Sequence, residues 1–393
     1  MINLKDVLIV GGSSGVGKSI AIQLLRHGVN HIDIVDKDEP DYSDLPKEDQ
    51  VLFHAKTTYL YHNLNNENYD LFDALGHIDS LFITAGFGRL THFENLTECE
   101  IDNLVKCNEL APIRIIKKYY NKIQSENDFY CAVMVSISGH VVSPLYSVYG
   151  ASKAGLAMFI ENINTELEAK NLKNRVLDCS PGFIEGTKFH NQTNDFNKTL
   201  NFASEIIEKA KQRQVLYIPY FDEVYKNVIE KYQEDPHAFG IDSYRYKMDR
   251  GRISMNPQCR IGYLSGTFDL FHIGHLNLLK NAKRHCDYLI VGVHKSGAWK
   301  NKETFIPLEE RKKIVAACRY VDMVVDSCSE DSDAWKKWNY NVLFVGSDYK
   351  GTERFNRYET FFANMEVEII YLPYTKSTSS TQLRKTIASA NNP

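Results

Sequence analysis

A tyrosine and a lysine that can tune each other's chemistry lie four residues apart, at Tyr149 and Lys153. We expect a helix there, at about 150–171, and residues spaced by four share one helix face. Reducing a ketone requires a hydride at carbon and a proton at oxygen. A free tyrosine has a pKa of about 10, and a nearby ammonium favours the phenolate and lowers that pKa. The pair therefore predicts a proton donor tuned by a cation.

A glycine-rich cluster follows the first apolar run of the chain, at residues 7–10, and precedes an expected helix from Lys18. Glycines allow a tight turn and let a phosphate approach the backbone, and the helix N-terminus supplies N–H donors. The segment from Gly12 to Ser19 also spells G-x-x-x-x-G-K-S, the phosphate loop of ATPases and GTPases. Taken alone, the loop fits either kind of site. The cluster reads Gly11-Gly12-Ser13-Ser14-Gly15-Val16-Gly17.

Two histidines three residues apart, His272 and His275, end the segment GTFDLFHIGH at an expected helix start. At that spacing both imidazoles can face one point. Such a pair can bind a metal, but the sequence lacks Cys or acidic ligands at matching spacings, so we predict no metal held by protein side chains. Imidazole N–H donors at a helix N-terminus can instead stabilise charge developing on an α-phosphate. The pair therefore favours nucleotidyl transfer.

The elements that would position these residues alternate between apolar runs and helical stretches. This alternation predicts α/β architecture with parallel sheets covered on both faces. We expect a polar loop at 183–200, and from about 234 to 258 Pro, Gly and charges occur without periodicity. The prediction is two Rossmann-like domains, 1–240 and 259–393, joined by a linker at 241–258. The expected strands lie near 7–10, 32–35, 81–84, 131–136, 175–179, 260–265, 288–293, 342–346 and 367–372.

The composition of this 393-residue chain indicates which classes of partner it can bind. Its 46 Lys and Arg against 50 Asp and Glu give a net charge of −4, so no bulk basic excess argues for nucleic acid. No apolar run approaches the length of a membrane span, and the first run is too short for a signal-peptide core. The 8 cysteines contain no C-x-x-C pair. We therefore expect a cytoplasmic protein with small-molecule substrates.

The first 240 residues resemble the short-chain dehydrogenase/reductase family, and this likeness favours the dinucleotide interpretation of the glycine loop. By resemblance, Tyr149 is the general acid, Lys153 tunes it and holds the nicotinamide ribose, Ser136 binds the carbonyl oxygen and Asn108 holds a water in the proton relay. Ser138 is a rival for the serine role, at a shorter spacing. The matching pieces are the glycine loop, Thr84-Ala85-Gly86, Asn108, Ala111-Pro112, Ser136, Gly139, Tyr149-Gly-Ala-Ser-Lys153 and Pro181-Gly182.

The same resemblance implies a bound NADH or NADPH. Asp36, at the end of the second strand, would accept hydrogen bonds from the adenosine ribose and repel a 2′-phosphate, which favours NAD. Lys37 follows directly and could instead attract that phosphate. The remaining residues expected to contact the cofactor are Gly11, Ser13, Ser14, Gly15, Val16, Gly17, Ala85, Gly86, Pro181, Gly182 and Thr187.

Residues 259–390 resemble the cytidylyltransferase family, most closely the bacterial glycerol-3-phosphate cytidylyltransferases. The resemblance implies that CTP with Mg²⁺ is a substrate and that His272 and His275 act on its α-phosphate. Two places depart from the family pattern: Tyr374 and Lys376 replace the Arg and Glu of its last motif, and Ser347 and Tyr349 alter the Gly-Asp-Asp-Trp block. The expected CTP and phosphate contacts are Gly266, Thr267, Phe268, Lys300, Lys302, Arg311, Asp348, Ser379, Ser380 and Thr381.

The departures put glycerol 3-phosphate in doubt as the acceptor, and the fusion suggests consecutive steps of one pathway. A carbonyl reductase beside a cytidylyltransferase predicts a CDP-activated alditol, such as CDP-ribitol or CDP-glucitol, made from a ketose phosphate directly or through a CDP-ketose. Such a product would serve capsular or teichoic-acid-like polymers. Two alternatives are a transferase whose reductase half only oligomerises, and a reductase controlled by a nucleotide-sensing C-terminal half. We expect a homo-oligomer.

Overall fold

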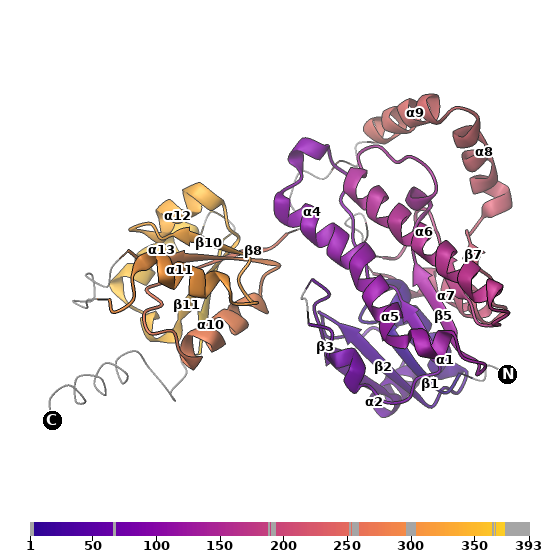
Figure 1. Cartoon of the computed structure of the whole chain (residues 1–393), viewed down its shortest axis with the longest axis horizontal. Helices are drawn as coiled ribbons and strands as arrows, with labels where there is room; N and C mark the ends of the chain where they lie inside the picture. The colour runs from indigo at the N-terminus through magenta and orange to yellow at the C-terminus, as the bar shows by residue number, and fades with distance from the viewer. Residues whose placement is uncertain are drawn as a thin grey trace. The chain divides into compact units, whose positions relative to one another are not determined.

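The structure is a computed structural model, and it describes residues 4–65, 68–187, 189, 194–250, 253, 259–295, 304–363, 365 and 367–373. The chain divides into two compact units, Met1–Asn256 and Pro257–Pro393. Each unit contains one parallel sheet (Figure 1). The predicted fold class, two α/β parallel-sheet domains, is therefore confirmed. No helix of the described segments is long and apolar enough to cross a membrane.

The sheet of the first unit has seven parallel strands in the order β3-β2-β1-β4-β5-β6-β7. The order reverses between β1 and β4, and ligands of such sheets bind beyond the carboxyl ends of the strands at this switch point. The glycine loop follows β1 and therefore lies at that position. The strands are β1 (Asp6–Val10), β2 (His31–Asp36), β3 (Thr57–Tyr61), β4 (Ser80–Ile83), β5 (Tyr130–Met134), β6 (Val176–Cys179) and β7 (Leu216–Tyr217).

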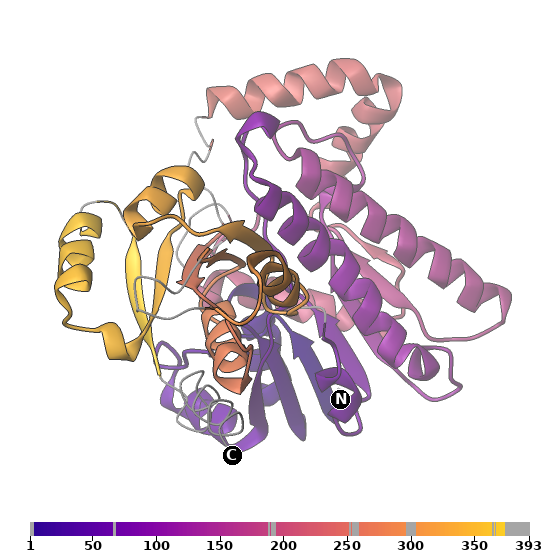
Figure 2. The same cartoon turned by 60° about the vertical axis from the view of Figure 1, so that its left-hand side comes forward.

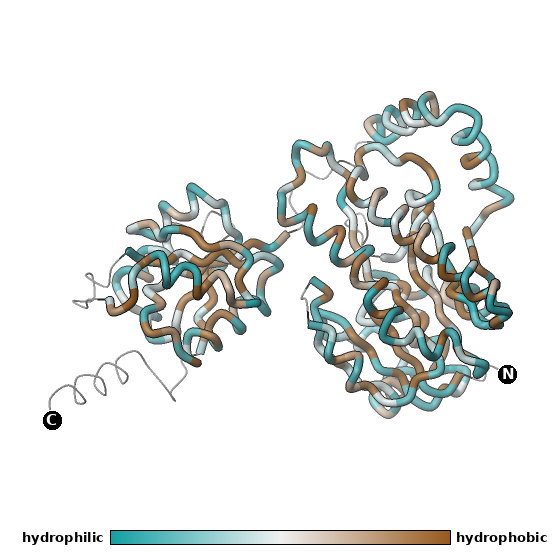
Figure 3. Tube along the Cα trace, in the orientation of Figure 1, coloured by the Kyte–Doolittle hydropathy of each residue, from teal (hydrophilic) through white to brown (hydrophobic). Residues whose placement is uncertain are grey.

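Both faces of this sheet are covered, because successive side chains of a strand point to opposite sides. On β1, Leu8 and Val10 pack into one buried cluster with α5 and α6, whereas Val7 and Ile9 pack into another with α1 and α7. The inner strands β1, β4 and β5 are accordingly mostly apolar, and hydrophobic colouring dominates the interior of this unit in Figure 3. The helices are α1 (Gly15–Arg26), α2 (Lys47–Lys56), α3 (Leu71–Ala74), α4 (Glu98–Val105), α5 (Ala111–Ile123), α6 (Ser147–Ala169) and α7 (Phe196–Lys211).

A π-helical turn, η2 (Lys106–Leu110), lies between α4 and α5. A reciprocal cap begins α4, since the Thr97 hydroxyl accepts from the Glu100 N–H and the Glu100 carboxylate accepts from the Thr97 N–H. Wide turns of this kind often mark functional sites. Here the turn contains Asn108, one of the predicted site residues.

Two segments expected to be irregular are helical instead. Helix α7 already begins at Phe196, inside the expected 183–200 loop, with Asp195 as its N-cap. Within 234–258, α9 (Pro236–Asp249) follows α8 (Lys226–Glu234), and Figure 2 shows the pair outside the two main helical layers. The proline that suggested a break occupies the first turn of α9, where its missing N–H costs nothing, and the Asp235 carboxylate caps His237 and Ala238.

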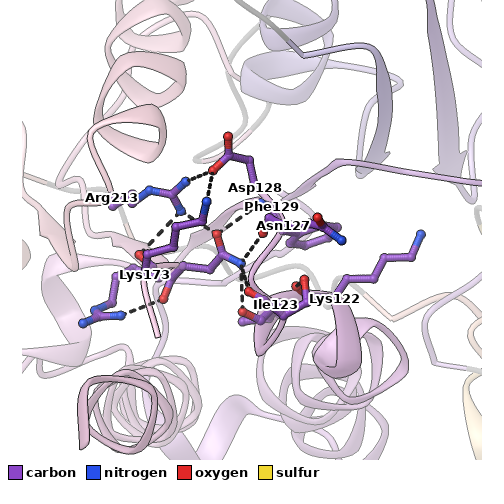
Figure 4. Close-up of polar contacts among 10 residues, drawn as sticks. Lys122, Ile123, Asn127, Asp128, Phe129, Lys173 and Arg213 are labelled. Carbon is purple, nitrogen blue, oxygen red and sulfur yellow. Dashed lines mark hydrogen bonds and ion pairs between the residues drawn. The ribbon is translucent and has the colours of Figure 1, made fainter. Parts of the chain in front are cut away.

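The buried side-chain amide of Asn174 joins two loops by hydrogen bonds at the amino edge of the first sheet, the region drawn in Figure 4. The Asn174 Nδ2 lies 2.8–3.1 Å from the carbonyl oxygens of Ile123, Ser125 and Asn127, and its Oδ1 accepts from the Phe129 N–H. Arg213 also donates to this oxygen and pairs with Asp128. These contacts fix where β5 begins. They lie at the end of the sheet opposite the switch-point site.

The second unit has five parallel strands in the order β10-β9-β8-β11-β12. Two buried clusters fill its two faces, with Leu264 of β8 in one and Tyr263 in the other. The histidine pair follows β8, the central strand. The strands are β8 (Ile261–Gly266), β9 (Tyr288–Val293), β10 (Met323–Asp326), β11 (Val342–Gly346) and β12 (Glu368–Leu372), and the helices are α10 (Ile273–Lys283), α11 (Leu308–Ala316), α12 (Asp331–Trp338) and α13 (Glu353–Phe362).

Candidate functional site

The glycine loop has the close backbone packing that a dinucleotide site needs. A Cβ on Gly17 would lie 2.1 Å from the Gly11 carbonyl oxygen and 2.5 Å from the Thr84 Oγ1, so only glycine fits at this position. Ser14 is the N-cap of α1, but its side chain caps no N–H of the helix among the described residues. The first-turn N–H groups of α1 therefore point toward the space above the loop, where a phosphate is bound in such folds.

The phosphate-loop interpretation of Gly12–Ser19 does not fit the structure. The Lys18 ammonium is turned away from the loop and pairs with Asp44 and the carbonyl oxygen of Asp41. The Ser19 hydroxyl is buried and is 2.6 Å from the Thr199 Oγ1 of α7. Neither side chain is placed to reach a triphosphate or its metal, so the dinucleotide interpretation is the one that the geometry supports.

Asp36 lies at the carboxyl end of β2, beside the glycine loop. Its Oδ2 accepts the Ser13 N–H at 3.0 Å, and its Oδ1 accepts the Asp38 N–H at 3.2 Å. A carboxylate has about four acceptor positions, so two ribose hydroxyl groups can still be accommodated. The carboxylate thus positions the loop and can bind a ribose at the same time.

The predicted catalytic side chains of the first unit come together at the carboxyl ends of β5 and β6. Tyr149 and Ser136 are both buried, and Ser136 is close enough to lower the pKa of the phenol against the effect of burial. Lys153, one turn further along α6, has its Nζ 5.9 Å from the centroid of the Tyr149 ring, and it donates to the Met134 carbonyl oxygen at 2.9 Å. Ser138, the rival serine, donates its N–H to the Ser136 Oγ at 3.1 Å, and Ser136 is the serine that lowers the pKa of Tyr149.

The pKa of Tyr149 moves opposite to the sequence expectation. Burial raises it to about 12, and the hydrogen bond with Ser136 offsets this only in part. The buried phenolate would lose its hydration, whereas the Lys153 ammonium is directed at a carbonyl oxygen rather than at the phenol. Burial also lowers the pKa of Lys153 to about 8. The phenol is therefore protonated at neutral pH, as a general acid requires.

Asn108 is fully buried and supports the site through the backbone after β4. Its Nδ2 donates to the Phe87 carbonyl oxygen at 2.8 Å, and its Oδ1 accepts the Phe87 N–H at 3.1 Å. Gly86 makes this approach possible, because a Cβ there would lie 3.0 Å from the Asn108 Oδ1 and 3.3 Å from the Lys153 Nζ. The side chain of Asn108 therefore fixes the backbone of Phe87 through two hydrogen bonds, a contact that we call the clamp. A water in a proton relay would have to be held by the main chain of Asn108.

The segment after β6 covers the glycine loop. Thr187 lies against Gly15, since a Cβ on that glycine would be 3.6 Å from the Thr187 Cγ2. The Pro181 carbonyl oxygen accepts the Ile137 N–H at 2.9 Å, which links this segment to the Ser136 turn. At Gly182 the hydroxyl of Tyr225 occupies the place of a side chain. The sequence offered no signal for Tyr225, which lies in the π-helical turn η5 (Phe221–Tyr225) after β7.

In the second unit, His272 and His275 meet as predicted. Their rings stack with centroids 4.0 Å apart. His272 is the N-cap of α10 and its Nδ1 accepts the Gly274 N–H at 3.0 Å, while the His275 Nδ1 accepts the His272 N–H at 3.4 Å. Since both Nδ1 atoms are acceptors, a neutral ring carries its proton on Nε2. Both histidines thus present an Nε2–H donor.

The electrostatics of the pair favour neutral donors. Burial lowers the pKa of His275 to about 3, with a further lowering by His272 and an opposing effect of Asp269. Burial also lowers the pKa of His272. Both rings are therefore neutral at pH 7 and act on a phosphate through hydrogen bonds rather than through charge.

The guanidinium of Arg311 does not have the surroundings expected of a phosphate-binding residue. It is fully buried, and its guanidinium donates to four backbone carbonyl oxygens at 2.6–3.1 Å, those of Thr267, His294, Lys295 and Ile306. The predicted direct contact with phosphate is therefore not what the structure shows. The planar set of N–H donors in a guanidinium can bind a phosphate, but it can equally bind carbonyl oxygens from several loops. Arg311 therefore positions the loops around the histidine pair.

Asp269, inside the GTFD motif, has a similar positioning role that sequence reasoning missed. Its carboxylate accepts the N–H groups of Phe305 and Ile306 at 3.0–3.2 Å and anchors the segment before α11. The sequence signal that could have identified Asp269 was the presence of an acidic residue inside the apolar GTFDLF segment. Asp269 is itself buried, so its role is to hold this segment.

The remaining predicted nucleotide contacts lie in different places. Gly266 ends β8 and Thr267 follows it, before the histidine pair, and Asp348 is exposed in η7 (Ser347–Tyr349) after β11. The Phe268 ring is buried in the core and its centroid is 5.3 Å from that of His275, so only its backbone can face a nucleotide. Five lie outside the described residues, namely Lys300, Lys302, Ser379, Ser380 and Thr381.

Comparisons with known proteins agree with the two geometries. Residues 5–198 match the short chain dehydrogenase family model, and residues 263–386 match the cytidylyltransferase-like family model. The glycerol-3-phosphate cytidylyltransferase of Bacillus spizizenii is 37% identical over 129 residues, which are 32% of this chain and 94% of that protein. The corresponding enzyme of Staphylococcus aureus is 32% identical over 124 residues, 30% of this chain and 89% of that protein.

Among solved structures, a short-chain dehydrogenase from Sphingobium yanoikuyae in complex with NADPH aligns at a TM-score of 0.48 and 18% identity, over 59% of this chain and 96% of that one. The two family matches cover separate units, and each includes the predicted cluster of side chains at the carboxyl edge of its own sheet. The chain is therefore a bifunctional enzyme that joins a short-chain dehydrogenase to a member of the cytidylyltransferase family.

Proposed function

We propose that the chain makes a CDP-activated sugar alcohol from a ketose phosphate, CTP and NADH or NADPH. The observation that supports this proposal is that one chain has two separate clusters of side chains suited to the two reactions, Tyr149 with Ser136 and Lys153, and His272 with His275. The carbonyl group becomes an alcohol, and the phosphate of the alditol displaces pyrophosphate from CTP. The product would supply a capsular or teichoic-acid-like polymer.

In the reductase site, this chain would orient the ketone and move one proton. Ser136 donates a hydrogen bond to the carbonyl oxygen, and Tyr149 gives that oxygen its proton. Lys153 and the main chain of Asn108 hold the relay that returns a proton to the phenol. The glycine loop, Asp36 and Thr187 would hold the dinucleotide, which supplies the hydride when bound.

In the transferase site, the two Nε2–H groups of His272 and His275 would donate to the α-phosphate of CTP while an alditol phosphate oxygen attacks the phosphorus in line. Mg²⁺ enters with the triphosphate as part of the substrate. Neutral donors placed in advance stabilise the charge that develops in the transition state without reorganisation. The enzyme is proposed to act in the cytoplasm, as a homo-oligomer.

The test is a panel of ketose phosphates incubated with CTP and either reduced cofactor, read by mass spectrometry for a CDP-alditol. Ribulose 5-phosphate and fructose 6-phosphate belong in the panel, with glycerol 3-phosphate and CTP alone as the comparison. A CDP-alditol with release of pyrophosphate supports the proposal. CDP-glycerol formed without any ketone reduction in the panel would overturn it.

A further inference from the structure

A lysine outside the predicted site, Lys247 of α9, contacts the segment that leads from Ser136 to α6. Its Nζ donates to the Ser143 Oγ at 2.7 Å and to the Pro144 carbonyl oxygen at 2.9 Å. Both acceptors belong to the segment between Ser136 and the start of α6. The helix that contains Lys247 occupies part of the region that sequence patterns assigned to a linker, so this contact is visible only in the fold.

Lys247 is close to the catalytic tyrosine through aromatic contacts. Its Nζ is 5.4 Å from the centroid of the Tyr146 ring, and that ring is 5.2 Å from the ring of Tyr149. A second connection runs through hydroxyl groups, because the Ser143 Oγ that accepts from Lys247 also accepts from the Ser138 Oγ at 3.2 Å. Ser138 in turn donates its N–H to the Ser136 Oγ. Two serines, Ser143 and Ser138, thus connect the ammonium to Ser136, which would bind the ketone.

Among the residues that the structure describes, no carboxylate balances the charge of Lys247, and burial alone lowers its pKa to about 8. Its other neighbours are hydroxyl groups, a carbonyl oxygen and an aromatic ring. Confining an ammonium without an acidic partner has a cost in solvation, and an anion from outside the chain would offset that cost. An ammonium has three N–H donors, and two are used by the loop.

We propose that Lys247 is the anion-binding residue of the reductase pocket and recognises the phosphate ester of the ketone substrate. The inference rests on the proposed function and names the feature that its substrates share. A ketose phosphate offers a phosphate monoester and a CDP-ketose offers a diphosphate, and both are anions several bonds from the carbonyl carbon. The contact would make the reductase select phosphorylated ketones over free sugars.

The test compares kcat/KM for ketone reduction with a phosphorylated ketose and with the same ketose without phosphate. Lys247→Gln is the informative variant, because the amide can still donate to Ser143 and Pro144 while the charge is absent. We expect the preference for the phosphorylated ketone to fall roughly 10- to 100-fold, the usual worth of a hydrogen bond to a charged group. Inorganic phosphate should also inhibit the variant less than the wild type.

Arg245→Gln is the matched control, since Arg245 is on the same helix but is exposed and pairs only with Asp242 in the described structure. It should keep the wild-type preference. Equal losses on both ketones in Lys247→Gln would mean that the lysine only supports the loop, and an unchanged preference would mean that it meets no anion. A third arm with CDP-ketose distinguishes the two anion sources. Failure of wild-type enzyme to reduce any ketone would refute the proposed function itself.

Discussion

The rings of His272 and His275 stack with their centroids 4.0 Å apart, and each Nδ1 accepts a backbone N–H at the start of α10. The same two side chains therefore cap the helix and present Nε2–H donors. Capping and catalysis use different atoms of each ring. A substitution can therefore separate the two roles, which leads to the first prediction.

We predict that His272→Asn suppresses CTP-dependent pyrophosphate release by roughly 10²- to 10³-fold, the cost of losing one donor placed in advance. The asparagine oxygen can replace the Nδ1 as acceptor, and Asn is a favoured N-cap, so the thermal stability should change little. Ketone reduction should be retained. His285→Asn, at an exposed histidine after α10, is the control. Near-wild-type pyrophosphate release in His272→Asn would remove the pair from the mechanism.

Tyr149→Phe should lower ketone reduction by about 10²- to 10⁴-fold, the range for a lost general acid, while pyrophosphate release stays normal. The ring still fills its buried place, so the fold should be retained. Absorbance of the reduced cofactor reports the first activity and a pyrophosphate assay the second. Tyr220→Phe, at an exposed phenol, should behave as wild type. A fully active Tyr149→Phe enzyme would exclude Tyr149 as the proton donor.

Asp36→Asn should shift the cofactor preference toward NADPH. The amide oxygen can still accept the Ser13 N–H that the carboxylate accepts at 3.0 Å, so the variant removes the charge and keeps the loop. Without that charge a 2′-phosphate is no longer repelled, and Lys37 follows directly. The measurement is kcat/KM with NADH and with NADPH for both proteins. An unchanged ratio would show that Asp36 does not discriminate between the two cofactors.

Arg311→Met should destabilise the second unit by about 3 kcal/mol or more, because carbonyl oxygens that the guanidinium now satisfies would be left buried and unpaired. Thermal unfolding followed by fluorescence of the tryptophans, all of which lie in that unit, reports the loss. Lys312→Met, which removes a partly exposed ion pair with Asp326, should cost far less. If Arg311 instead touches only phosphate, the unliganded variant will be as stable as the wild type.

The pH dependence of ketone reduction should follow Lys153. Its pKa is lowered to about 8, so it is charged below that pH and loses its proton above it, whereas Tyr149, with a pKa of about 12, stays protonated throughout. We expect kcat/KM to be level near pH 7 and to decline as the pH rises through about 8. Lys153→Arg, if it folds, should lack this decline. A flat wild-type profile from pH 6 to 10 would contradict the assignment.

The parts that periodicity could predict are those that local sequence controls. Buried strands such as 7–10 are apolar throughout, and the reaction motifs lie directly after strands or at helix starts. Tyr149 and Lys153 share a face because they are four residues apart on one helix, and His272 and His275 meet for a similar local reason. The sequence therefore predicted both the fold class and the composition of the two clusters.

The parts that it could not predict depend on contacts between distant segments. Pro236 suggested a chain break, but in the first turn of α9 it begins the helix that contains Lys247. Arg311 looked like a phosphate ligand, and only the folded loops supply the carbonyl oxygens around it. Lys18 matched the pattern of a phosphate loop, but in the fold its ammonium pairs with Asp44 and does not face the loop. In each case the residue type was informative, and a partner elsewhere in the chain decided its role.

The π-helical turn at Lys106–Leu110 has a consequence for tracing the ancestry of this chain. One residue turns a regular α-helix by about 100°, so removing one residue here would rotate α4 against α5 and break the clamp of Asn108 on Phe87. In an alignment of homologous sequences, a single-residue gap in this stretch therefore belongs at the turn, because a gap placed elsewhere would move Asn108 out of register.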